Sequence, residues 1–185
     1  NVKSIRNAFE NQEAEVILTR ERETILKADG LVLPGVGAFS HGMESLNKYG
    51  LVEIIKDFVK TGKPLLGICL GMQLFSKFSY EGNFEGLGWF DAEVMKFNVE
   101  DKIRFKVPHM GWNSIEIEKE SRLLNGISQS ELFYFVHSYY VKCTEKNDIV
   151  GTTNYSMDFA SIIQKENIIG VQFHPEKSHD KGLRL

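Results

Sequence analysis

The chain has 185 residues, of which 42% are hydrophobic and 25% charged, a composition typical of a single globular domain with one continuous core. The net charge is only -3 and lysines and arginines do not cluster, so electrostatics gives no reason to expect a nucleic-acid partner. No apolar run is long enough to span a bilayer, and we expect no membrane contact. The two cysteines lie far apart, which favours reduced thiols and a cytoplasmic location over a disulfide scaffold.

Helical and strand patterns alternate through the first part of the chain. Apolar periodicity predicts helices over residues 3–10, 21–27 and 50–60, and buried strands over residues 15–19 and 30–34. Strands that alternate with helices favour an α/β fold whose sheet is doubly wound and mostly parallel, with right-handed crossovers.

A further buried strand is predicted over residues 64–68, and it stops at a cysteine, Cys69. A helical pattern follows, from residue 70 to residue 78. Gly67 and Gly71 leave room for a strained turn that pushes the thiol out at the top of the sheet, as in a nucleophile elbow. The start of a helix also favours the thiolate form. The alternative interpretation is a small buried hydrophobic residue, which we adopt for Cys143, because an alternating strand without glycines surrounds it.

Two other segments carry candidate chemistry. In the sequence PGVGAF at 34–39, two glycines bracket one residue, so backbone amides could turn outward and hold a developing negative oxygen; a plain tight turn is the alternative. A last buried strand, residues 168–173, ends on His174, Pro175 and Glu176. The proline holds His174 extended, and the carboxylate could orient the imidazole as a base; a loop histidine with a solvated Glu176 is the alternative.

The second half of the chain has a different pattern. A glycine-rich loop at 81–88 precedes alternating strands predicted over residues 89–97, 103–107, 114–118 and 132–143. These predict an antiparallel portion attached to the parallel sheet. The sequence HMGWN at 109–113 is interpreted as a loop that serves either as a contact site or as an aromatic plug. The histidines show no paired spacing with the cysteines, so we predict no metal site and no cofactor.

Taken together, GICLGMQ at 67–73 and FHPE at 173–176 resemble the class I, triad-type glutamine amidotransferases, which have a flavodoxin-like fold. Within that family, the segments 34–39, 109–113, 134–140 and 172–178 look like the glutaminase subunits of imidazole glycerol phosphate synthase, from histidine biosynthesis. The resemblance implies one amidotransferase domain over residues 1–185. It also implies that the first strand of the domain and the end of its last helix are missing, which would leave backbone groups unpaired.

The resemblance assigns roles to individual residues. Cys69 would attack the side-chain amide of L-glutamine, His174 would carry the proton to the departing ammonia, and Glu176 would orient the imidazole. The oxyanion hole would be formed by backbone amides of Leu70 and of the 35–37 turn, with Val36 preferred and Gly37 beside it. The implied substrate contacts are Gly35, Gln73, Glu81, Ser138 and Tyr139.

The resemblance also implies a partner, a (β/α)₈-barrel cyclase that forms a heterodimer with this subunit and receives its ammonia. Residues 109–113 and 137–140 are candidates for the docking face, and the 34–39 turn for the switch that responds to the partner. Three alternatives stay open. They are a paralogous glutaminase that supplies a sugar amidotransferase in surface polysaccharide synthesis, a non-catalytic regulatory module on the same fold, and a cysteine peptidase or other thiol hydrolase.

Overall fold

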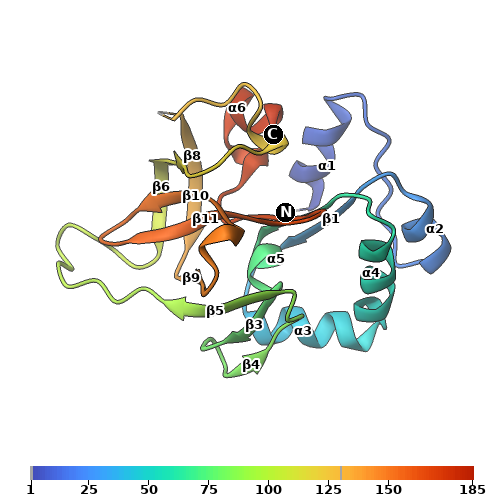
Figure 1. Cartoon of the computed structure of the whole chain (residues 1–185), viewed down its shortest axis with the longest axis horizontal. Coiled ribbons are helices and arrows are strands. Elements are labelled where there is room, and N and C mark those ends of the chain that lie inside the picture. The colour runs from blue at the N-terminus through green and yellow to red at the C-terminus, as the bar shows by residue number, and fades with distance from the viewer. Residues whose placement is uncertain (1, 130) are drawn as a thin grey trace.

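A computed structural model of the chain describes residues 2–129 and 131–185; Asn1 and Ser130 lie outside the described residues. A central sheet carries helices on both faces (Figure 1). The α-helices are α1 (Val2–Glu10), α2 (Arg22–Lys27), α3 (Phe39–Lys48), α4 (Leu51–Lys60), α5 (Leu70–Gln73) and α6 (His179–Arg184). The 3₁₀ helices are η1 (Arg122–Leu124), η2 (Lys146–Asp148) and η3 (Pro175–Lys177). None of these described helices is long and apolar enough to cross a membrane.

The strands fall into one large sheet and one small one. They are β1 (Leu31–Gly35), β2 (Leu65–Cys69), β3 (Ser76–Ser79), β4 (Phe84–Glu85), β5 (Phe90–Lys96), β6 (His109–Ser114), β7 (Glu116–Ile117), β8 (Leu132–His137), β9 (Tyr139–Cys143), β10 (Ile149–Asn154), β11 (Asp158–Lys165) and β12 (Ile168–Val171). The large sheet runs β1-β2-β12-β11-β9-β5-β3-β4, and β6 pairs with β8 separately.

Three parallel strands position the candidate site. β2 lies between β1 and β12 and is parallel to both. Their carboxyl ends therefore meet at one edge of the sheet, where open α/β folds bind ligands. Gly35 at the end of β1 is in register with Cys69 at the end of β2. The predicted strands at 30–34, 64–68 and 168–173 are confirmed, although the last one ends at Val171.

Both faces of the sheet are covered by apolar packing. On one face, Ile5 of α1 joins a cluster with Phe133 and Phe173. On the other, Met43 of α3 and Ile55 of α4 pack against the sheet. The predicted helices at 3–10, 21–27 and 50–60 are confirmed as α1, α2 and α4. The fold is thus doubly wound, as predicted.

The predicted antiparallel portion is also confirmed. β11 pairs antiparallel with β10, β12 and β9, and β9 pairs antiparallel with β5. The strand predicted over 89–97 corresponds to β5. The one predicted over 132–143 is divided at Ser138 into β8 and β9, because β8 leaves the large sheet to pair with β6. The strand predicted over 114–118 is divided between the end of β6 and the short β7.

Three local predictions are wrong. Residues 15–19 form no strand, and Ile17 and Leu18 are 59% and 70% exposed, because no described strand lies beside them to pair. Residues 103–107 are also irregular, with Ile103 90% exposed. Residues 109–113 are not a loop, since they form β6 and pair residue by residue with β8, from His109 opposite His137 onward.

The helix predicted to continue from Cys69 through residue 78 is much shorter. α5 ends at Gln73, and residues 76–79 form β3, which pairs parallel with β5. The backbone oxygens of Leu74 and Phe75 accept hydrogen bonds from Leu87 and Trp89 and leave the helical pattern. A single helical turn follows the cysteine, so its chemistry depends mainly on neighbouring side chains.

Candidate active site

Cys69 sits in a strained corner between β2 and α5, with φ 54° and ψ -107°. The corner requires glycine on both sides. A Cβ on Gly71 would lie 1.8 Å from the backbone oxygen of Leu33, and a Cβ on Gly67 would lie 2.5 Å from the ring of Phe75. Such strain persists only where the surrounding structure enforces it, and it is typical of nucleophile elbows. The predicted elbow geometry is present, and Cys69 is 7% exposed at the edge of the sheet.

His174 follows β12 and is held by Glu176. The imidazole Nδ1 lies 2.8 Å from the carboxylate Oε1, and both side chains are almost fully buried. Because Nδ1–H donates to Glu176, Nε2 is left for the Cys69 thiol; this nitrogen has no other hydrogen-bond partner among the described residues. Burial opposes the charged imidazole, yet the Cys69 thiol and the Glu176 carboxylate outweigh it and raise the pKa of His174 to about 9. The imidazole is therefore protonated at neutral pH.

The loop that carries His174 is tied to β8 by two hydrogen bonds and is braced internally by a third. The backbone N–H of His174 donates to the backbone oxygen of Tyr134 at 2.9 Å, and the Tyr134 N–H donates to Ser178 Oγ at 3.0 Å. Ser178 Oγ–H in turn donates to the backbone oxygen of His174 at 2.6 Å. The position of the imidazole is thus set by the small β6–β8 sheet as well as by β12.

The turn predicted to supply the oxyanion hole lies beside the elbow. Gly35 is in register with Cys69, and a Cβ on it would lie 2.8 Å from Cβ of Leu70. Gly37 adopts φ 101°, a conformation that favours glycine, and Val36 is 61% exposed. The fold therefore brings the backbone of Gly35 against Leu70, the residue that follows the nucleophile, and the turn continues from there.

Glu81 reaches the same turn from the glycine-rich loop. Its Oε2 accepts a hydrogen bond at 2.9 Å from the backbone N–H of Phe39, in the first turn of α3. A carboxylate is favourable at a helix N-terminus. Glu81, predicted as a substrate contact, thus lies beside the turn, and one of its oxygens is already used to fix the end of that turn.

The other predicted substrate contacts are part of a buried hydrogen-bond network. The Nε2 group of Gln73 donates to the backbone oxygen of Tyr139 and to Oε1 of Gln172, each at 3.0 Å, which leaves its own Oε1 to accept from a substrate amine. The backbone oxygen of Ser138 accepts from the N–H of Phe97. The Ser138 and Tyr139 carbonyls are therefore engaged within the protein, and a substrate carboxylate would have to approach their amides.

Sequence reasoning missed several residues of this site. Gln172 is fully buried, and its Nε2 lies 3.6 Å from Sγ of Cys69. Its signal was a single glutamine within the otherwise apolar run 168–173. Tyr134 and Ser178 were quoted only as parts of motifs, and no sequence pattern indicated that their hydrogen bonds hold the His174 loop.

Comparison with known proteins identifies the family. A sequence model described as "Glutamine amidotransferase class-I" matches residues 1–183, and the chain belongs to this family. It is 47% identical over 186 residues to imidazole glycerol phosphate synthase subunit HisH 2 of Methanococcus maripaludis, covering 100% of this chain and 91% of that protein. It is also 46% identical over 188 residues to the HisH 1 subunit of the same synthase from Campylobacter jejuni, covering 100% and 92%.

A solved structure described as a glutamine amidotransferase superposes with a TM-score of 0.75 and 16% identity, covering 99% of this chain and 89% of that one. At that identity the likeness concerns the fold. The predicted fold class and the predicted family are therefore both confirmed.

Proposed function

We propose that this chain is a glutaminase subunit that hydrolyses L-glutamine to glutamate and ammonia. The ammonia passes to a cyclase subunit that makes imidazole glycerol phosphate in histidine biosynthesis. The observation that carries the proposal is the buried grouping of Cys69, His174 and Glu176 where two parallel strands end. The names of the full-length relatives from Methanococcus maripaludis and Campylobacter jejuni support the pathway.

The geometry supports a two-step acyl transfer. The Cys69 thiolate attacks the side-chain carbonyl carbon of glutamine, and the protonated His174 gives its Nε2 proton to the amide nitrogen as the C–N bond breaks. Ammonia leaves and a glutamyl thioester remains. Neutral His174 then takes a proton from water, whose oxygen attacks the thioester, and glutamate departs as the C–S bond breaks. Glu176 fixes the imidazole through Nδ1 in both steps.

The negative oxygen formed in each step needs backbone donors. The amide of Leu70 and that of Val36, with Gly37 as the pivot, are the donors we assign, because the turn begins at Gly35, which lies against Leu70 at the elbow. One such donor is worth on the order of a hundredfold or more in rate. Rotation of the Val36 peptide is the switch that would let a partner turn catalysis on.

The proposed partner is a (β/α)₈-barrel cyclase in a heterodimer. Ammonia released into water at neutral pH is mostly protonated and no longer nucleophilic, so delivery to a docked acceptor gives the hydrolysis its use. The relatives are named as subunits of a synthase, which supports a partner for this chain as well.

The test of this function is glutamate release by the full chain alone, with the barrel cyclase, and with the cyclase plus its acceptor ligand. We expect slow release alone and strong stimulation only by the loaded cyclase. Release that ignores the cyclase would instead indicate the sugar-amidotransferase paralogue. Absence of release under all three conditions would favour the non-catalytic module.

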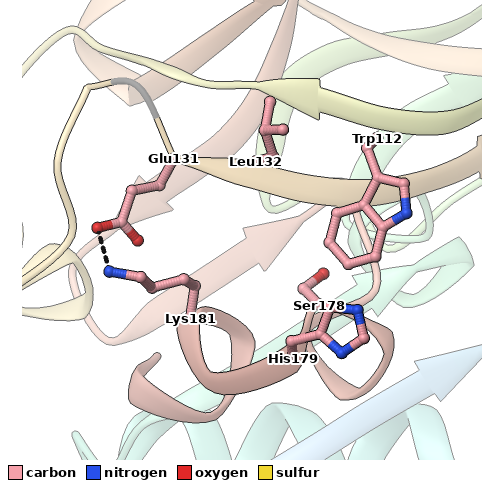
Figure 2. Close-up of a pocket in the computed structure, with 6 residues that line it drawn as sticks. All are labelled: Trp112, Glu131, Leu132, Ser178, His179 and Lys181. Atoms are coloured by element: carbon pink, nitrogen blue, oxygen red, sulfur yellow. Dashed lines mark hydrogen bonds and ion pairs between the residues drawn. The ribbon is translucent and has the colours of Figure 1, made fainter.

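The outer face of the β6–β8 sheet is the docking surface that we assign to the cyclase. Of the predicted segments, His109 and His137 point inward and are buried, whereas Met110 and Trp112 are 61% and 44% exposed. Beside Trp112 lies a pocket of about 380 Å³, shown in Figure 2, where its ring stacks on His179 at 4.9 Å. Exposed aromatic side chains of this kind are frequent anchors of interfaces.

This surface is connected to the catalytic loop. Trp112 lies opposite Tyr134 in the β6–β8 pairing, and their rings are 5.9 Å apart. The backbone of Tyr134 is hydrogen-bonded to both His174 and Ser178. A partner that shifts Trp112 would therefore act on the segment that positions the imidazole.

Trp112→Ala is expected to weaken binding of the cyclase by roughly tenfold to a hundredfold, because a buried aromatic anchor typically contributes a few kcal/mol. The affinity would be measured by titration calorimetry with the purified cyclase. Leu18→Ala is the matched control, since Leu18 is also exposed, at 70%, but belongs to the irregular segment before α2. Unchanged affinity for Trp112→Ala would remove the β6–β8 face from the interface.

A further inference from the structure

We propose that Gln172 is a positioning residue for the nucleophile: it presents its amide N–H to Sγ of Cys69, and a buried chain of hydrogen bonds fixes it in that orientation. The inference rests on the proposed role of Cys69 and adds a donor that stabilises its thiolate. Gln172 is suited to this task by its place, one residue after β12 and beside the elbow.

The orientation of the Gln172 amide decides its effect on sulfur. With Nε2 toward Sγ, 3.6 Å away, the amide donates a hydrogen and favours the thiolate. If the amide were turned by 180°, Oε1 would face the sulfur and accept from the thiol S–H, which favours the neutral form. The side chain is fully buried, so no water is available to compensate either arrangement.

The neighbouring Gln73 determines which arrangement occurs. The backbone oxygen of Tyr139 can only accept, so the group of Gln73 that meets it at 3.0 Å must be the amide NH₂. The second hydrogen of the same nitrogen points to Gln172, also at 3.0 Å, and requires an acceptor there. Oε1 of Gln172 must therefore face Gln73, and its NH₂ must face Cys69.

The Tyr139 carbonyl also accepts a hydrogen bond from a buried histidine, His137, which is itself bonded to a second one, His109. His137 Nδ1–H donates to that oxygen at 2.8 Å. Burial lowers the pKa of His137 to about 3, against the opposing effect of this hydrogen bond, and lowers the pKa of His109 to about 4. Both rings are therefore neutral near pH 7, and each carries one N–H.

Neutrality fixes the direction of every remaining hydrogen bond. Because His137 uses its N–H at Nδ1, its Nε2 must accept, and the donor is Nδ1 of His109 at 3.0 Å. His109 Nε2 then accepts from Nδ2 of Asn113 at 3.3 Å. Asn113 is itself oriented, since its Oδ1 accepts from the N–H of Ser114 at 2.9 Å. Two runs of donors thus meet at the Tyr139 oxygen: one comes from β6 through the histidine pair, and Gln73 donates both to that oxygen and to Gln172, which donates to the thiol.

Among the described residues, few other groups near the Cys69 thiol could stabilise its thiolate, so the Gln172 donor matters. The titratable side chain that faces Sγ is His174, with Glu176 behind it, and His137 near His174 stays neutral. The helix after Cys69 has only four residues. Gln172 thus complements the imidazolium as a second donor to the sulfur.

The test is the pH profile of Cys69 alkylation by iodoacetamide, from about pH 5 to about pH 10, in a Cys143→Ala background so that one thiol reacts. Gln172→Leu keeps a similar volume without a donor. We expect its profile to move to higher pH by about one unit, since a hydrogen bond to a charged group is worth about one such unit, with the plateau at high pH unchanged.

A second variant tests whether Gln73 sets the orientation of the Gln172 amide. Gln73→Glu cannot donate to the Tyr139 oxygen or to Gln172, so the Gln172 amide should turn its NH₂ toward the new carboxylate and its oxygen toward sulfur. Its alkylation profile should also move to higher pH although Gln172 is intact. Gln164→Leu is the matched control for Gln172→Leu. Gln164 is a partly buried glutamine of β11 that bonds to Ser121, and its replacement should leave the alkylation profile unchanged.

If the midpoint of the alkylation profile stays at the same pH in Gln172→Leu, or in Gln73→Glu, the inference is wrong. A lowered plateau with an unmoved midpoint would also overturn it, because it would show a merely structural role. If Gln172→Leu does not fold, Gln172→Glu replaces it, with the same expected direction. Alkylation needs no glutamine turnover, so this result is independent of whether the proposed glutaminase function holds.

Discussion

Cys69→Ala is expected to lower glutamine hydrolysis by on the order of 10⁵-fold, because the acyl-transfer route has no other nucleophile at the elbow. The assay is glutamate release in the presence of the cyclase loaded with its acceptor ligand. Alanine tolerates the same backbone corner about as well as cysteine does, so the fold should be retained. Cyclase turnover with added ammonium salt should also be retained, which separates loss of hydrolysis from loss of docking.

Cys143→Ala is the matched control for this substitution. Burial raises the pKa of the Cys143 thiol to about 12, with Asp148 adding to the effect, so this thiol is neutral and unreactive near pH 7. Its removal should leave glutamate release within about twofold of the parent chain. Hydrolysis that survives Cys69→Ala, or disappears with Cys143→Ala, would contradict the assignment of the nucleophile.

Gly71→Ala is expected to lower the free energy of unfolding by more than about 4 kcal/mol, or to prevent folding. The added Cβ would lie 1.8 Å from the backbone oxygen of Leu33 in β1. That oxygen belongs to a paired strand, so relief requires β1 and α5 to separate. The measurement is urea unfolding followed by circular dichroism.

Gly30→Ala provides the comparison. Its Cβ would meet only Pro64, at 3.6 Å, which is ordinary van der Waals contact. A change within about 0.5 kcal/mol is expected there. If Gly71→Ala unfolded at the same urea concentration as Gly30→Ala, the close approach of β1 and α5 described here would be wrong.

The amino-acid sequence determined the parallel core and the position of its chemistry. The runs that form β1, β2 and β12 are short, continuous and apolar, and the strands end at Gly35, Cys69 and Val171. Strands of that kind are buried and parallel, and their carboxyl ends share one edge. This is why Cys69, His174 and the 35–37 turn could be predicted to lie near each other although they are far apart in the chain.

Strand pairing was decided only by the tertiary structure. The apolar residues at 15–19 and 103–107 have the composition of strands, yet a strand exists only where a neighbour accepts its hydrogen bonds. For the same reason residues 109–113 become β6, since β8 lies alongside. The elbow helix stops at Gln73 because β5 offers residues 76–79 a better set of partners.

Within the site, the sequence indicated the groups that we propose to react, and the tertiary structure decided what orients them. The glycine corner singled out Cys69 by local pattern, whereas His174 and Glu176 were assigned through the family resemblance. The direction of the Gln172 amide depends on Gln73 of α5 and on the Tyr139 carbonyl of β9. The direction of each hydrogen bond depends on the assembled network, because a group must donate wherever its neighbour can only accept.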